Sequence, residues 1–98
     1  MELHVTGPTE ITINKNIKSI GDYQLIRKEV LALVENGANA VTLKIPDSLS
    51  MTSAVIGFFI KLIRHEQKKV TMYIGDRRLH ELLDELNLTE IFNVRRIN

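Results

Sequence analysis

The sequence predicts an α/β domain in which a mixed sheet of four or five strands is covered by helices. The hydrophobic period changes several times along the chain, between the two-residue repeat of strands and the three-to-four-residue repeat of helices. Turn-forming residues separate these segments, and single strands alternate with helices, which is typical of a partly parallel sheet. The 98 residues contain no linker, repeat or low-complexity tract, so a single domain covering residues 1–98 is expected.

The first segments predict a pair of strands. Residues 3–5 are a short strand candidate, and Gly7 and Pro8 supply a turn. Residues 10–14 then alternate polar with β-branched apolar side chains, as a half-buried strand does. A leading hairpin or strand pair is therefore expected.

A helix is predicted after Gly21, where apolar residues recur at spacings of three and four. These residues are Tyr23, Ile26, Val30, Leu33 and Val34. Asp22 is favourable near the positive end of the helix dipole, and Asn36 with Gly37 supplies a stop signal. Residues 40–45 follow as a strand that ends at Pro46, because proline cannot continue a central ladder.

A second helix is predicted from Thr52 or Ser53 to about Lys69. On a helical wheel its apolar residues cover more than the arc that one sheet can bury. The expected inward residues are Val55, Ile56, Phe59, Ile60 and Ile63. Leu62 lies at the margin of this arc, and Phe58 points least inward.

The last third of the chain predicts a strand, a helix and a short final strand. Residues 70–74 form the strand, Asp76 is a good N-cap, and Asn87 ends the helix. Its apolar stripe consists of Leu79, Leu82, Leu83 and Leu86. One more turn is expected over residues 89–92, with a short strand over 94–97.

Composition and charge exclude several classes of function. The 13 Lys and Arg residues are balanced by 12 Asp and Glu residues, so direct binding to nucleic acid is not expected. The absence of cysteine and the scattered histidines argue against a metal site, and no cofactor or catalytic residue is predicted. The longest apolar run, residues 54–60, is far shorter than the roughly 20 residues of a membrane span. A cytoplasmic, non-enzymatic domain without signal peptide or membrane insertion is the expectation.

Four hydroxyl side chains gather at the junction between the third predicted strand and the second helix. They are Ser48, Ser50, Thr52 and Ser53. Free backbone N–H groups and the helix dipole favour an anion at such a junction, although caps and turns use the same residue types. A phosphate on Ser53 would add a charge of about −1.5 to −2 there.

The stretch from Ile45 to Phe59, followed by the strand at 70–74 and by residues 76–88, resembles the STAS domain of bacterial anti-sigma factor antagonists. The resemblance covers nearly the whole chain in its order of elements and implies a STAS-like mixed sheet covered by helices. In that family a serine at the start of a helix is phosphorylated by an anti-sigma factor that is a serine kinase. The acceptor corresponds to Ser53, with Thr52 as a second candidate.

Two positions of the family motif differ in this chain. The resemblance matches Ile56 to an apolar position and Gly57 to the second glycine of the motif. The acidic residue before the acceptor is replaced by Thr52, and the first glycine is replaced by Val55. The lost carboxylate removes a group that can orient the acceptor, and a branched side chain stands where a kinase would approach.

The resemblance implies a regulatory protein that binds an anti-sigma factor when unmodified and thereby frees a sigma factor for transcription. Phosphorylation would block binding, and a PP2C-type phosphatase would restore it. The expected partner-binding residues are Ser50, Thr52, Ser53, Val55, Ile56 and Phe58. An exposed Phe58 beside Val55 and Leu62 would form an apolar patch. The alternative, in which Phe58 packs under a neighbouring element, stays open.

Two other functions fit the same sequence. A STAS domain can be a non-phosphorylated scaffold subunit of a larger assembly, such as a lipid-transport ABC system, and the changes at Thr52 and Val55 favour that function. A small nucleotide- or ligand-binding module would use the turn at 75–79 together with the helix start near Ser53. The family commonly continues into a C-terminal helix, so the end at Asn98 is expected to leave apolar surface for a partner or for a second copy in a homodimer.

Overall fold

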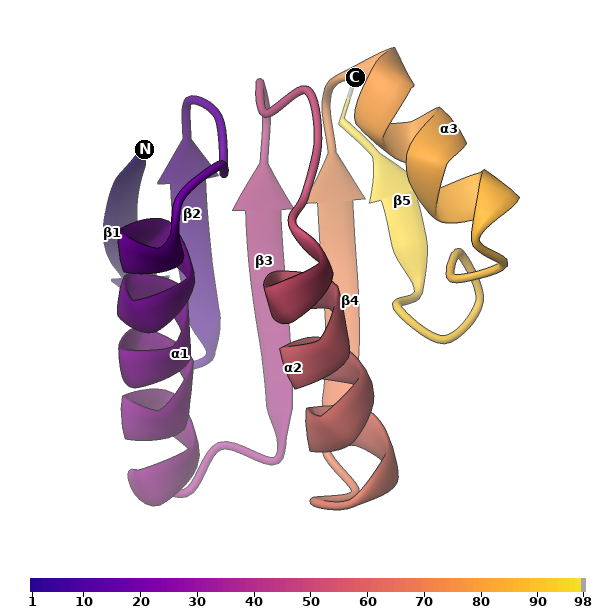
Figure 1. The fold of residues 1–98 in the computed structure, drawn as a ribbon. Coiled ribbons are helices and arrows are strands. Elements are labelled where there is room, and N and C mark those ends of the chain that lie inside the picture. The colour runs from indigo at the N-terminus through magenta and orange to yellow at the C-terminus, as the bar shows by residue number, and fades with distance from the viewer. Residues whose placement is uncertain (98) are drawn as a thin grey trace.

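The computed structural model describes residues 1–97 as five strands and three helices (Figure 1). The strands are β1 (Glu2–Gly7), β2 (Glu10–Asn14), β3 (Ala40–Ile45), β4 (Lys69–Ile74) and β5 (Val94–Arg96). The helices are α1 (Ile20–Glu35), α2 (Ser53–Arg64) and α3 (Arg77–Glu85). This element order confirms the predicted alternation of strands with helices.

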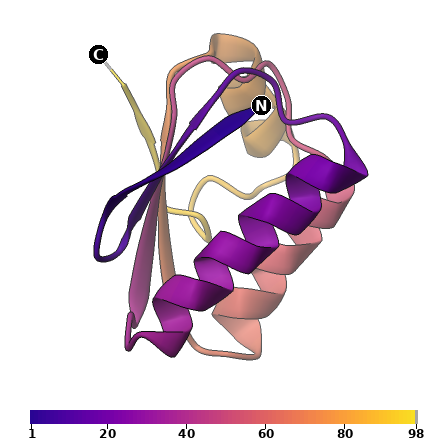
Figure 2. The ribbon, with the colours of Figure 1, turned by 90° about the vertical axis from the view of Figure 1, so that its left-hand side faces the viewer.

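The strands form one mixed sheet in the order β1-β2-β3-β4-β5. Strands β1 and β2 pair antiparallel as the predicted hairpin, whereas β2, β3, β4 and β5 are parallel to their neighbours. The three helices lie on the same side of the sheet (Figure 2). The connections that lead into α2 and α3 therefore both leave the sheet at the edge where β3 and β4 end (Figure 1).

Burial in the sheet follows its two faces. In β2, Ile11 and Ile13 are buried while Thr12 between them is half-buried, and β3 alternates in the same way. The buried face packs against the helices in one hydrophobic core that contains Phe59 and Phe92. The other face carries mostly polar side chains because successive strand residues point to opposite sides.

Helix α1 begins earlier than the sequence indicated. Ser19 is its N-cap, and the hydroxyl of Ser19 accepts a hydrogen bond from the backbone N–H of Asp22 while the Asp22 carboxylate accepts from the Ser19 N–H. The Asp22 carboxylate also accepts the Lys18 N–H, and this bond is the main reason that its pKa lies below the usual value. Asp22 therefore acts through a reciprocal capping box as well as through the helix dipole. Gly37 adopts φ 101° just after the helix, as the predicted stop signal requires.

The predicted extent of α2 is wrong at its C-terminal end, because the helix ends at Arg64 and Lys69 belongs to β4. Gln67 takes a left-handed φ of 55°, which breaks the helical path. The N–H of Lys68 then bonds to the Leu62 carbonyl, and the N–H of Lys69 bonds to the Asn39 carbonyl beside β3. The helix ends here because the chain has to return to the sheet and begin β4. The polar residues after Arg64 would by themselves allow the helix to continue.

The buried stripe of α2 is rotated relative to the predicted one. Val55, Phe59 and Leu62 are the buried residues, and Leu62, expected at the margin, is only 2% exposed. The three isoleucines expected to point inward are half-buried; they are Ile56, Ile60 and Ile63. The rotation arises because α2 packs against both the sheet and α1, so its contacts span two directions.

Helix α3 begins after its predicted N-cap, Asp76. Leu79 and Leu83 are buried in the core, whereas Leu86 is the C-cap and is 49% exposed, so the predicted stripe is too long by one residue. Asn87 ends the helix with a left-handed φ of 57°. A turn over residues 89–93 then leads into β5, and Phe92 in this turn is buried.

Candidate functional site

The four hydroxyl residues of the predicted site lie on the connection between β3 and α2 or at the first turn of α2. They occupy different environments. Ser48 is 0% exposed, Thr52 is half-buried, and Ser50 and Ser53 are exposed. Only part of the predicted hydroxyl cluster is therefore available at the surface.

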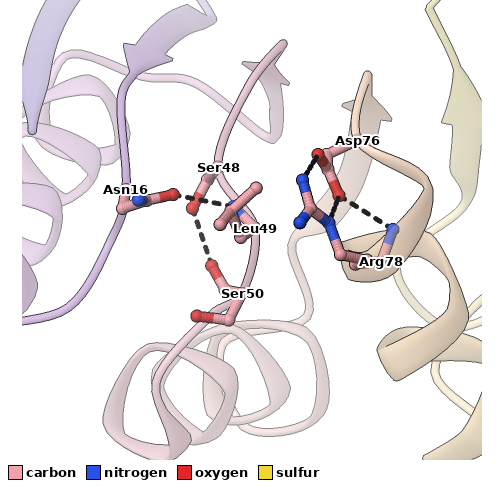
Figure 3. A network of polar contacts seen from close by, with 6 residues as sticks. All are labelled: Asn16, Ser48, Leu49, Ser50, Asp76 and Arg78. Atoms are coloured by element: carbon pink, nitrogen blue, oxygen red, sulfur yellow. Dashed lines mark hydrogen bonds and ion pairs between the residues drawn. The ribbon is translucent and has the colours of Figure 1, made fainter.

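Ser48 holds this connection in place. Its hydroxyl accepts a hydrogen bond from the backbone N–H of Ile17 at 3.0 Å and donates one to the carbonyl of Ser50 at 2.7 Å (Figure 3 shows the contact with Ser50). The bond to Ile17 crosses from the β3–α2 connection to the segment before α1. A buried hydroxyl with both functions satisfied fixes two backbone segments relative to each other.

Two further hydrogen bonds join the same segments. The Leu49 N–H donates to the side-chain oxygen of Asn16 at 2.9 Å, and the Lys15 N–H donates to the Asp47 carboxylate at 2.7 Å (Figure 3 shows the Asn16 contact). Lys15 has a left-handed φ of 68° where the chain leaves β2. Together with the Ser48 bonds, these contacts hold the β2–α1 connection against the β3–α2 connection, and we call this set of bonds the clamp. The clamp was not predicted from the sequence.

We expect Ser48→Ala to lower the free energy of unfolding by about 1–3 kcal/mol, because it leaves the buried Ile17 N–H without a partner. Urea unfolding followed by circular dichroism measures this loss. Ser50→Ala is the matched control, since the bond from Ser48 goes to the Ser50 backbone and is retained. Equal stabilities of the two variants would show that the hydrogen bonds of the Ser48 hydroxyl contribute nothing to stability.

Thr52 and Ser53 differ in how their hydroxyls are used. The Thr52 hydroxyl accepts the N–H of Val55 at 3.3 Å and caps α2. Ser53 is the first residue of the helix and is exposed, and its hydroxyl makes no hydrogen bond within residues 1–97. The predicted helix start is confirmed, and Ser53 is the freer of the two candidate acceptors.

Val55 does not reach the surface, because its side chain is 0% exposed in the core. Of the two alternatives for Phe58, the apolar patch with Val55 and Leu62 is wrong, since both aliphatic side chains are buried. Phe58 and Ile56 are half-buried, and the Phe58 ring packs edge-on against Phe59 with centroids 5.1 Å apart. The branched side chain at position 55 packs inward and adds no bulk where a kinase would approach.

A hollow of about 240 Å³ lies beside Ser53, between the starts of α1 and α2. Lys18, Ile20 and Tyr23 line it from the α1 side, and Thr52 and Ser53 line it from the other. Ile20 is 77% exposed, the highest value among the exposed large apolar side chains. Ile20 thus supplies exposed apolar surface beside Ser53, where the sequence suggested a patch centred on Phe58. The sequence pattern alone does not indicate that Ile20 lies there.

The turn at 75–79, considered for nucleotide binding, is held by its own ion pairs. The Arg78 guanidinium donates to both carboxylate oxygens of Asp76, at 3.2 Å and 3.0 Å, and this contact is the main reason that the pKa of Asp76 lies below its usual value (Figure 3). Arg77 pairs with Glu81 at 2.9 Å. Both guanidinium groups are therefore engaged within α3 and its cap.

Among residues 1–97, no three acidic or histidine side chains gather in a way that would hold a metal ion. None of the helices in this part of the chain has the length and apolar character required to cross a membrane. In comparisons with known proteins, no family model matches the chain, and no curated protein or solved structure matches it significantly.

Proposed function

We propose that this chain is a STAS-type regulatory protein of the anti-sigma factor antagonist kind, which binds a serine-kinase anti-sigma factor through the surface around Ser53. The observation that carries the proposal is the exposure of Ser53 at the first residue of α2, beside the exposed apolar side chain of Ile20. The order of strands and helices also agrees with what the resemblance implies. Binding would sequester the anti-sigma factor and free its sigma factor.

Ser53 is the preferred phosphoryl acceptor. The Thr52 hydroxyl is half-buried and caps α2, so its modification would remove a helix cap. Ser53 Oγ would attack the γ-phosphorus of ATP held by the partner kinase, ADP would leave, and the hydroxyl proton would pass to a base of that kinase. Hydrolysis by a PP2C-type phosphatase would return the free serine and inorganic phosphate.

A phosphate on Ser53 would change both the charge and the shape of the surface. It would carry a charge of about −1.5 to −2 at the positive end of α2, where the helix dipole and the nearby Lys18 stabilise an anion. The same group would occupy the hollow beside Ile20. An apolar partner surface that covered it would have to remove water from the phosphate, which costs free energy. The modified chain therefore stays folded but loses complementarity to the partner.

We expect Ser53→Asp to weaken binding to the cognate anti-sigma factor by about tenfold. Calorimetry with each kinase-type anti-sigma factor encoded in the same genome measures the affinity. Thr9→Asp is the charge-matched control, because Thr9 is exposed in the β1–β2 turn, away from α2. Wild-type affinity of Ser53→Asp, or phosphate mapped by mass spectrometry to neither Ser53 nor Thr52, would contradict the switch.

A second candidate is a non-phosphorylated scaffold subunit of a lipid-transport ATPase. It is favoured by the capping role of Thr52, which stands at the position of the family's acidic residue. The Thr52 hydroxyl is already engaged by the N–H of Val55 in the helix backbone. In this case the Ile20 and Ser53 surface would bind the ATPase without a chemical switch. Equal retention of the ATPase by Ser53→Ala and Ser53→Asp, with no binding to anti-sigma factors, would select this function.

A further inference from the structure

A second surface lies between helices α1 and α2, which pack side by side and run in the same direction (Figures 1 and 2). A groove of about 440 Å³ separates their outer sides. Leu31 and Phe58 give it apolar walls, and Tyr23 continues it into the hollow beside Ser53. The groove is thus contiguous with the surface assigned to the partner above.

The groove carries two cations on opposite walls. Arg27 projects from α1 and Lys61 from α2, and both are exposed and form no ion pair with any of residues 1–97. Tyr23 lies one helical turn before Arg27 and Leu31 one turn after it, so apolar side chains flank the cations in both directions. Glu66 supplies the one acidic lining residue, at the end remote from Ser53.

Gly57 in this groove has no role in packing the chain itself. A Cβ at this position would meet no atom within 4 Å, whereas glycine inside a helix costs about 1 kcal/mol relative to alanine. The missing side chain leaves the α2 backbone open to close approach by another molecule. The combination of an open backbone, apolar walls and two unpaired cations is what the occupant must match.

We propose that this groove docks an acidic amphipathic helix of the partner protein, which sets an apolar side chain over Gly57 and carboxylates against Arg27 and Lys61. The proposal rests on the proposed function for the identity of the partner. A third helix fits over two packed helices by placing its ridge in their groove. A fatty acid or similar lipid is disfavoured because its carboxylate is terminal, whereas the cations here have apolar surface on both sides.

The occupant can be identified by photo-crosslinking in the native host. The probe is p-benzoylphenylalanine in place of Phe58, which keeps an aromatic ring in the groove wall, and the control is the same amino acid in place of Tyr73 on the open face of the sheet. We expect position 58, and not position 73, to crosslink to a peptide with several Asp or Glu residues and apolar residues at spacings of three and four. A lipid adduct, a peptide without this pattern, or no crosslink specific to position 58 would overturn the proposal.

Charge and shape variants then test the contacts. The double variant Arg27→Glu with Lys61→Glu should weaken binding of the crosslinked protein by about tenfold or more. Lys28→Glu with Arg64→Glu makes the same charge change on the same helices outside the groove and should bind as wild type. Gly57→Gln should also lose binding while the chain stays folded, because it fills the groove with a residue that favours helix.

The two proposals can fail separately. If an anti-sigma factor binds the wild type and all groove variants equally, the groove proposal is wrong and the proposed function holds. If position 58 captures an acidic helix from a protein that is neither an anti-sigma factor nor a transport ATPase, the groove proposal holds and the proposed function is wrong.

Discussion

Phe59→Ala should lower the free energy of unfolding by about 3–5 kcal/mol, the largest effect we expect from one substitution in this chain. Phe59 is fully buried and connects α2 to the C-terminal part of the core through its edge-on contact with Phe92, with ring centroids 6.4 Å apart. Phe58 also packs edge-on against the Phe59 ring. Alanine would leave a cavity between elements that are distant in sequence, so the core cannot easily collapse around it.

The measurement is urea unfolding followed by circular dichroism, because the chain contains no tryptophan to report by fluorescence. A domain of this size has a total stability of about 5–15 kcal/mol, so the variant should lose a large part of it. Leu86→Ala is the control, since Leu86 is an exposed apolar residue and should change stability by no more than about 0.5 kcal/mol. A loss below about 1 kcal/mol for Phe59→Ala would contradict the central role of this ring.

The elements that the sequence predicts well are those bounded by local signals. Strand β3 occupies residues 40–45 because alternating β-branched and apolar residues precede Pro46, and Asp76 caps α3 because its carboxylate needs only the N–H groups of the next turn. The end of α2 has no such signal. His65 and the polar residues after it are compatible with helix, and the bond from Lys69 to Asn39 that begins β4 joins segments 30 residues apart.

In the candidate site, too, the features set by neighbouring residues were predicted, and those set by distant contacts were not. The start of α2 at Ser53 is a local feature and was predicted, together with its cap at Thr52. The role of Ser48 depends on the backbone of Ile17, and nothing in the identity of either residue indicates that they meet. Ile20 was not singled out because its importance comes from its position across a hollow from Ser53. A contact between a side chain in one loop and the backbone of another leaves no signal in the sequence pattern, so it cannot be predicted from that pattern.

Gly75→Ala should lower the free energy of unfolding by about 3 kcal/mol, at the upper end of the usual cost of overpacking. A Cβ at Gly75 would overlap the carbonyl oxygen of Pro46 and lie 2.7 Å from its carbonyl carbon. These are backbone atoms, so no side-chain rotation can relieve the clash. Gly75 is also held there by its N–H bond to the Ile45 carbonyl at 2.9 Å.

The strain should extend to the candidate site, because Pro46 begins the connection that carries Ser48. We expect faster amide hydrogen exchange at Ile17 in Gly75→Ala, since displacement of Pro46 loosens the hydroxyl that accepts this N–H. Gly57→Ala is the matched control: with open space around its Cβ, it should raise stability by about 0.5–1 kcal/mol and leave exchange at Ile17 unchanged. The same chemical change should thus have opposite signs at the two glycines, and destabilisation by both would show that the space around Gly57 is filled by the chain itself.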